Sequence, residues 1–160
     1  MKSLLNTQSK SLLMLAIKSE LTAANTYKYL ANHMQRLAYF GMQKYFIAES
    51  ESELNHYQRI VDFINDMGDV ADMPAIEEIS EDINDIGEAL TIAYEMELGL
   101  LNQYKDFYNQ IEEQDITIAQ FLLQFIEIQR KAVGEYNDLL VRYDIANKTN
   151  EILLFDKLIE

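Results

Sequence analysis

The sequence predicts an all-α protein in which four long helices pack as one bundle and a short fifth helix follows. Helix breakers are rare, since the 160 residues include one proline and five glycines. The absence of cysteine excludes disulfides, zinc–thiolate sites and iron–sulfur clusters. We expect a single domain over residues 1–160, with helices at about residues 7–36, 41–68, 84–112, 116–145 and 149–158.

The connections between the helices predict how the bundle is arranged. Short connections follow the first and third helices, so each should form an antiparallel pair with the next helix. The long helices, at roughly 28 residues each, would be about 42 Å long. The middle connection, residues 69–83, holds Pro74 and several acids, and about 15 extended residues reach about 50 Å. It can therefore run the length of the bundle and make the second and third helices parallel, the topology of ferritin-like folds.

The charge of the chain limits its partners. There are 27 acidic and 13 basic residues, which give a formal net charge of −14. Phosphate contacts need clustered Lys and Arg, so we expect no nucleic-acid partner. No segment has the apolar length of a membrane span, and residues 1–10 lack the apolar core of a signal peptide, so we expect no membrane partner and a cytoplasmic location. An acidic protein attracts cations, although solubility alone would account for this composition.

Polar residues interrupt the inward faces of the predicted helices. Residues three and four apart share one helix face, and the apolar face packs inward. The exceptions on these faces, most of them near mid-helix, are Glu20 on the first helix, Glu49, Glu53 and His56 on the second, Glu97 on the third, and Gln129 and Glu135 on the fourth.

The midpoints of matched helices meet in one layer, whichever way each helix runs. Unpaired ionised carboxylates in that layer would be strongly destabilising, and no Lys or Arg lies on the inward faces to compensate them. A bound cation would compensate their charge. Carboxylate and imidazole ligands suit iron or manganese, with zinc also compatible, and Glu53 and His56 at i and i+3 can bind one ion together. The alternative is a water-filled cavity with a hydrogen-bonded core histidine. It is disfavoured because five polar residues are expected at one height: Glu20, Glu53, His56, Glu97 and Gln129.

Several segments match one known family in order and spacing. They are Glu20 with Tyr27 on the first helix, Glu53-x-x-His56 on the second, Glu97 on the third, Phe121 to Gln129 on the fourth, and Leu153 to Lys157 near the end. Together they resemble the prokaryotic non-haem ferritins over nearly the whole chain. In this family Tyr27 would lie beside the ferroxidase site. Glu95 is close enough to Glu97 that a small shift in register would exchange them.

The resemblance implies an iron-storage protein. Glu20, Glu53, His56 and Glu97 would bind non-haem iron inside the bundle, with Gln129 beside them and Glu53 bridging two irons. Fe(II) would be oxidised by oxygen or peroxide and stored as ferric mineral in a homo-oligomeric shell of 24 subunits.

Some positions depart from the family pattern. The family commonly has a glutamate just before the fourth-helix glutamine and another three residues after it, where this chain has Ile128 and Ala132, and Ser52 replaces an acid before the bridging glutamate. The first iron position would be complete, the second would lack its fourth-helix carboxylate, and the auxiliary third would be absent. Glu135, about one turn beyond Ala132, would have to reach in to replace that carboxylate. Leu54 replaces a methionine of the haem-binding relatives, and we expect no haem.

The sequence is compatible with four functions. They are an iron store with ferroxidase activity, a store with little or none, a di-metal carboxylate oxidase acting on an organic substrate, and a structural helical module. Tyr27 would hydrogen-bond a ligand, donate an electron or simply pack in the core. The roles of Glu49 and Glu135 stay open.

Overall fold

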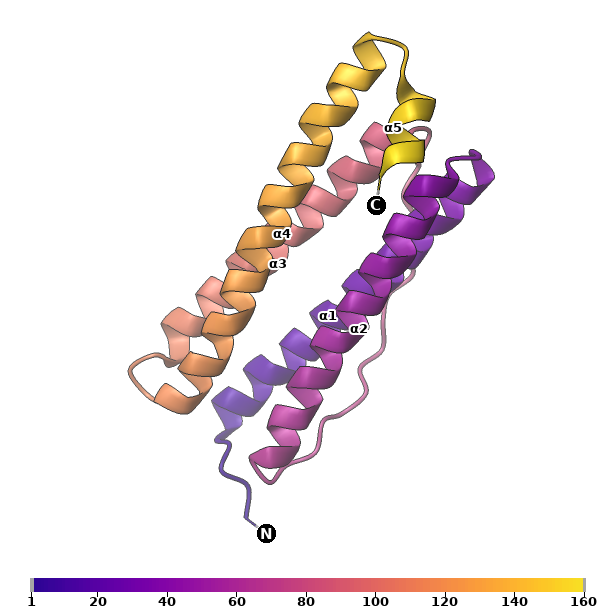
Figure 1. Cartoon of the computed structure of the whole chain (residues 1–160). Coiled ribbons are helices and arrows are strands. Elements are labelled where there is room, and N and C mark those ends of the chain that lie inside the picture. The colour runs from indigo at the N-terminus through magenta and orange to yellow at the C-terminus, as the bar shows by residue number, and fades with distance from the viewer. Residues whose placement is uncertain (1, 160) are drawn as a thin grey trace.

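Five helices form the fold in the computed structural model, which describes residues 2–159. They are α1 (Thr7–Arg36), α2 (Phe40–Asp66), α3 (Ile86–Ile111), α4 (Ile116–Lys148) and α5 (Ile152–Leu158). The predicted all-α bundle with a short last helix is confirmed (Figure 1). Within the described residues, no helix combines the length and apolar character needed to cross a membrane.

α1 has both of its predicted ends, and the ends of the other helices lie within three residues of the predicted ones. Local chemistry explains where several of them lie. α2 ends just before Gly68, whose φ of 77° is left-handed. α3 starts after Asp85, whose carboxylate accepts a hydrogen bond from the N–H of Glu88 at 2.8 Å. α4 extends to Lys148, and Asn150, with a φ of 58°, turns the chain into α5.

Two antiparallel hairpins build the bundle. α1 packs along α2, and α3 packs along α4 (Figure 1). Residues 67–85 run beside the first hairpin from one end of the bundle to the other, so α2 and α3 point the same way. The long crossover predicted from the sequence is therefore confirmed.

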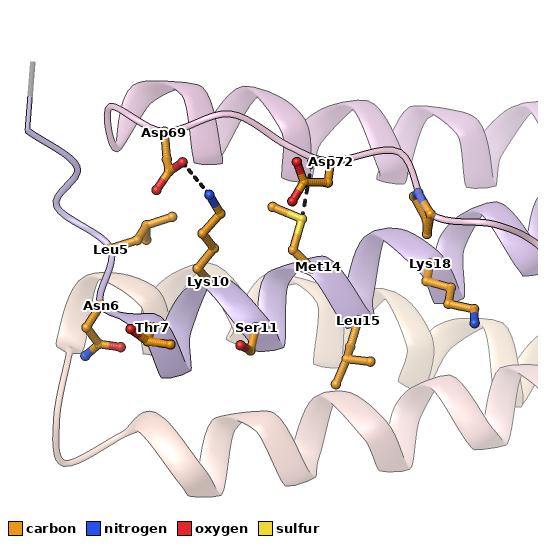
Figure 2. Close-up of a pocket in the computed structure, with 11 residues that line it drawn as sticks. Leu5, Asn6, Thr7, Lys10, Ser11, Met14, Leu15, Lys18, Asp69 and Asp72 are labelled. Atoms are coloured by element: carbon orange, nitrogen blue, oxygen red, sulfur yellow. Dashed lines mark hydrogen bonds and ion pairs between the residues drawn. The ribbon is translucent and has the colours of Figure 1, made fainter.

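The first part of this crossover lies against α1 (Figure 2). The ammonium of Lys10 is 2.7 Å from the carboxylate of Asp69, which also accepts a hydrogen bond from the Ser3 hydroxyl at 2.7 Å. The N–H of Asp72 points to the sulfur of Met14 at 3.4 Å. A shallow groove of about 750 Å³ lies between these elements. Exposed ion pairs contribute little to stability, so these contacts mainly fix the path of the connection.

The core consists of two apolar clusters with a polar layer between them. One cluster lies toward the start of α1 and includes Leu13, Ile17, Ile64, Phe107 and Phe125. The other lies toward the opposite end and includes Leu30, Met34, Phe46, Leu90 and Leu139. Each fully buried side chain of this size contributes roughly 1.5–3 kcal/mol, so the clusters hold the helices firmly on both sides of the layer.

The start of α2 is capped by a residue distant in sequence. Tyr39 precedes the helix and makes no side-chain cap. Instead the carboxylate of Asp156, on α5, accepts hydrogen bonds from the N–H groups of Gly41 at 3.2 Å and Met42 at 2.8 Å. A side chain at position 41 would collide with the Asp156 carbonyl oxygen. Glycine therefore lets α5 dock closely enough to cap α2.

Candidate metal centre

The polar layer buries three carboxylates and an amide at the middle of the bundle. Glu20 on α1 is 0% exposed, Glu53 on α2 3%, Glu97 on α3 1% and Gln129 on α4 0%. Glu95 lies on the exposed side of α3. The inward position of Glu97 thus settles which of these two acids lies in the layer. Charged side chains are almost never buried this fully without a partner.

Three of the predicted ligands converge tightly. One ligand atom each from Glu20, Glu53 and His56 lies within 4.8 Å of the other two. His56 Nδ1 is 2.9 Å from Glu53 Oε2 and 3.6 Å from Glu20 Oε2. Two carboxylates and an imidazole at this spacing form a ligand set for a divalent first-row metal.

Buried oxygens in this layer lack hydrogen-bond partners. Glu20 Oε2 is buried with no protein donor, and so is Glu97 Oε2. None of the Lys or Arg ion pairs within residues 2–159 involves the carboxylates of the layer. A cation would satisfy these oxygens, so the residues present fit a bound metal ion.

Burial raises the pKa of three carboxyls at the metal-free site and so favours their protonated form. Desolvation raises the pKa of Glu53 well above its ordinary value, and the neighbouring Glu20 adds to the rise. Desolvation likewise raises the pKa of Glu97, to about 7, and raises that of Glu49. A metal ion that binds to these three carboxyls displaces their protons, so its affinity falls as the pH falls.

Buried tyrosines hold the carboxylates in place. The Tyr27 hydroxyl donates to Glu97 Oε1, and the Tyr104 hydroxyl donates to Glu20 Oε1. Burial raises the pKa of both phenols well above the ordinary value, so they stay protonated and act as donors. Each tyrosine occupies one carboxylate oxygen and leaves the other available, as outer-shell partners of metal ligands do.

Sequence reasoning singled out Tyr27 and missed two other tyrosines. The Tyr136 hydroxyl donates to Glu49 Oε2 at 3.1 Å, and the Tyr104 hydroxyl donates to Glu20. A usable signal was present, because Tyr104 lies two turns after Glu97 on the same face, as Tyr27 does after Glu20.

A cavity of about 220 Å³ adjoins the cluster on the side of α2, α3 and α4. Glu49, Glu53, Glu97 and Gln129 all contribute to its wall. Ala132 also lines it, at the place where the family pattern leads one to expect a carboxylate. Glu135 lines the cavity too but is an exposed residue, which puts it at the rim.

Comparisons with known proteins agree with this arrangement. A family model described as a ferritin-like domain matches residues 10–145. A probable bacterial non-heme ferritin-like protein of Haemophilus influenzae is 20% identical over 140 residues, covering 86% of this chain and 85% of the relative. A bacterial non-heme ferritin of Staphylococcus aureus is 27% identical over 145 residues, covering 86% and 84%.

The fold is shared with a solved archaeal structure. The open pore ferritin of Archaeoglobus fulgidus superposes with a TM-score of 0.92 at 18% identity, covering 97% of each chain. With a family model that matches most of the sequence and relatives that match over most of their length, the chain belongs to the ferritin family.

Proposed function

We propose that this protein stores iron, taking up Fe(II) at the buried cluster, oxidising it and retaining Fe(III) in a homo-oligomeric shell. The observation that carries the proposal is the convergence of Glu20, Glu53 and His56 within 4.8 Å in the core. Within this group, the buried Glu20 Oε2 has no hydrogen-bond donor, which leaves a place for a cation. Membership in the ferritin family supports iron as that cation.

The ligand set suits the oxidation step. Carboxylate oxygens are hard ligands that stabilise Fe(III) relative to Fe(II), which makes the loss of one electron per iron more favourable. Two Fe(II) ions supply the two electrons that reduce oxygen to hydrogen peroxide, or hydrogen peroxide to water. Glu53 belongs to the cluster and also lines the cavity, so its two oxygens can serve two ions.

Tyr27 has two roles in this proposal. Its hydroxyl orients Glu97, the carboxylate that it contacts, by hydrogen bonding. The same phenol, fully buried next to the site, is an electron donor when fewer than two irons are present to reduce the oxidant. In that event its proton passes to the Glu97 carboxylate.

Assembly into a shell, which we expect to contain 24 subunits in the cytoplasm, is supported by family membership. Stepwise addition of Fe(II) in air, followed by size-exclusion chromatography with iron and protein assays on the same fractions, tests storage. We expect hundreds of ferric ions to elute with a large particle. Iron that precipitates outside the particle, as in a protein-free control, would contradict storage.

A second candidate is a store with little ferroxidase activity, and Ala132 on the cavity wall favours it. The two functions differ in rate. Stopped-flow ferric absorbance at two Fe(II) per subunit should be much faster for the wild type than for Glu53→Gln if the centre oxidises iron. Equal rates would indicate a store without ferroxidase activity at this centre. Iron oxidation in a small oligomer without mineral would instead indicate a di-metal oxidase.

A further inference from the structure

The cavity beside the buried cluster presents oxygen atoms from three helices. Glu49 and Glu53 line it from α2, Glu97 from α3 and Gln129 from α4. Its volume of about 220 Å³ is several times the share of one water molecule in the liquid, about 30 Å³. It can therefore hold a metal ion together with one or more waters.

Gln129 points to an occupant that the protein itself does not supply. The residue is 0% exposed, yet neither its amide oxygen nor its amide nitrogen has a hydrogen-bond partner. Leaving a buried polar group unsatisfied costs about 1–3 kcal/mol, so such groups ordinarily have a partner. Glu97 Oε2, on the facing helix, is buried and unpartnered as well. A cation would bind both oxygens, and a further water in the cavity would accept from the amide nitrogen.

Glu49 is placed to supply what α4 lacks. It lies one helical turn before Glu53, so both carboxylates project from the same face of α2. Tyr136 donates to its Oε2 at 3.1 Å, which holds the side chain on the cavity side and leaves Oε1 free. The residue is half-buried, and its contact with a tyrosine of α4 ties it to the helix that carries Ala132.

We propose that this cavity is a second divalent-cation position in which Glu49 replaces the missing carboxylate of α4. The cation is held by Glu49, Glu53 and Glu97, with the Gln129 amide oxygen as a neutral ligand. Among the described residues, only Glu20, Glu53 and His56 have ligand atoms that already lie within 4.8 Å of one another. The ligands of the second position therefore reach a common ion by rotation about their side-chain bonds. The inference rests on the proposed iron function and adds the ligand set of its second site.

The two positions differ in chemistry. The first includes an imidazole, which suits zinc as well as iron. The four proposed ligands of the second all offer oxygen, which suits Mn(II), Mg(II) or Fe(II), although His56 also lines the cavity. A competing possibility is that the Lys131 ammonium, in place of a metal ion, neutralises the carboxylates of the cavity. Its side chain also lines the cavity, but it is 65% exposed and its Nζ lies 3.9 Å from Glu127.

Manganese separates these possibilities because free aqueous Mn(II) is counted directly by its electron paramagnetic resonance signal. The assembled apo-protein is titrated in buffered salt that screens its surface acids. We expect the wild type to bind two tight Mn(II) ions per subunit and Glu49→Gln to bind one. This substitution keeps an oxygen that accepts from Tyr136. Glu51→Gln, an exposed change on α2, is the matched control and should keep both ions.

Further variants distinguish this proposal from the iron function itself. His56→Ala should lose one ion and keep the one that depends on Glu49. Anomalous scattering from a crystal soaked in Mn(II) should place that ion between Glu49 and Glu97.

A Glu49→Gln protein that still binds two ions would overturn the proposal. A wild type that binds one ion, lost in His56→Ala, would overturn it while leaving the iron function intact. No loss in His56→Ala would instead contradict the assignment of Glu20, Glu53 and His56 as the first iron site.

A resident Lys131 ammonium would have its own signature. If it were the counter-ion of the cavity, Lys131→Gln would raise the count of tight Mn(II) ions from one to two. We expect two ions in both the wild type and this variant. A gain on removing the lysine would overturn the proposal that the cavity of the wild type takes a cation.

Discussion

Replacing Glu97 by glutamine should stabilise the metal-free protein at pH 8. The carboxyl is 1% exposed, and burial raises its pKa from 4.5 to about 7. A carboxyl with a higher pKa in the folded chain binds its proton more tightly there than in the unfolded chain. The free energy of unfolding therefore falls as the pH rises from 4.5 to about 7, and the loss is complete above that range. Glutamine has no charge to bury and escapes the loss.

The size of the effect follows from the pKa. A rise from 4.5 to about 7 corresponds to about 3 kcal/mol at 1.36 kcal/mol per unit. The glutamine oxygen still accepts from Tyr27, but its amide nitrogen gains no acceptor from the protein, which removes about 1 kcal/mol of the benefit. A net gain of about 2 kcal/mol would raise the melting temperature by roughly 4–8 °C for a chain of this length.

Urea unfolding followed by circular dichroism, with a chelator and at equal protein concentration, measures the difference at pH 8 and pH 5. We expect a clear gain for Glu97→Gln at pH 8 that shrinks toward pH 5. Glu95→Gln, an exposed change on the same helix, is the control and should be neutral at both. A variant no more stable than the wild type at pH 8, or an equal gain from Glu95→Gln, would refute the reasoning.

Other perturbations test the remaining contacts. Glu20→Gln and His56→Ala should each weaken anaerobic Fe(II) binding by about tenfold or more in calorimetry, because each removes a direct ligand. Tyr27→Phe should slow the rise of ferric absorbance in stopped flow by about tenfold, since it frees a buried carboxylate. Asp156→Ala should lower the stability to thermal unfolding by about 1 kcal/mol by removing the α2 cap, and Gly41→Ala by more, because its methyl group collides with α5.

Each of these predictions has a contrary outcome. Unchanged Fe(II) affinity in His56→Ala would place the iron elsewhere. An unchanged oxidation rate in Tyr27→Phe would reduce that residue to packing. If Asp156→Ala melts like the wild type, water caps α2 as well as the carboxylate does.

Much of the fold was predictable from local patterns. Residues at spacings of three and four define the inward faces. On α1 this spacing gives seven positions, all of which are buried: Leu13, Ile17, Glu20, Ala24, Tyr27, Ala31 and Met34. The length of residues 69–83 was enough to predict the crossover. Glu20, Glu53 and His56 could be grouped because ionisable residues at mid-helix on an apolar face are costly to bury unless they share a ligand.

What the sequence did not predict depends on contacts between distant segments. The capping of α2 by Asp156 joins residues 114 positions apart, and nothing in either segment indicates the other. Tyrosine fits an apolar face without needing a polar partner, so Tyr136 could not be told from a packing residue. The position of Tyr104, two turns after Glu97, was a signal, but it did not identify Glu20 as the partner of its hydroxyl. The partnership of Glu49 with Tyr136 likewise depends on the rotation of α2 against α4.

The most direct test of iron binding at the buried cluster is anaerobic Fe(II) titration of the apo-protein, compared with the Glu53→Gln variant. This variant removes the carboxylate that the cluster and the cavity share. We predict saturable binding of two Fe(II) ions per wild-type subunit, followed by ferric absorbance when oxygen is admitted, and the loss of most of this binding in the variant. Equal binding by both proteins, or no saturable binding by the wild type, would contradict the assignment of this site as the iron centre.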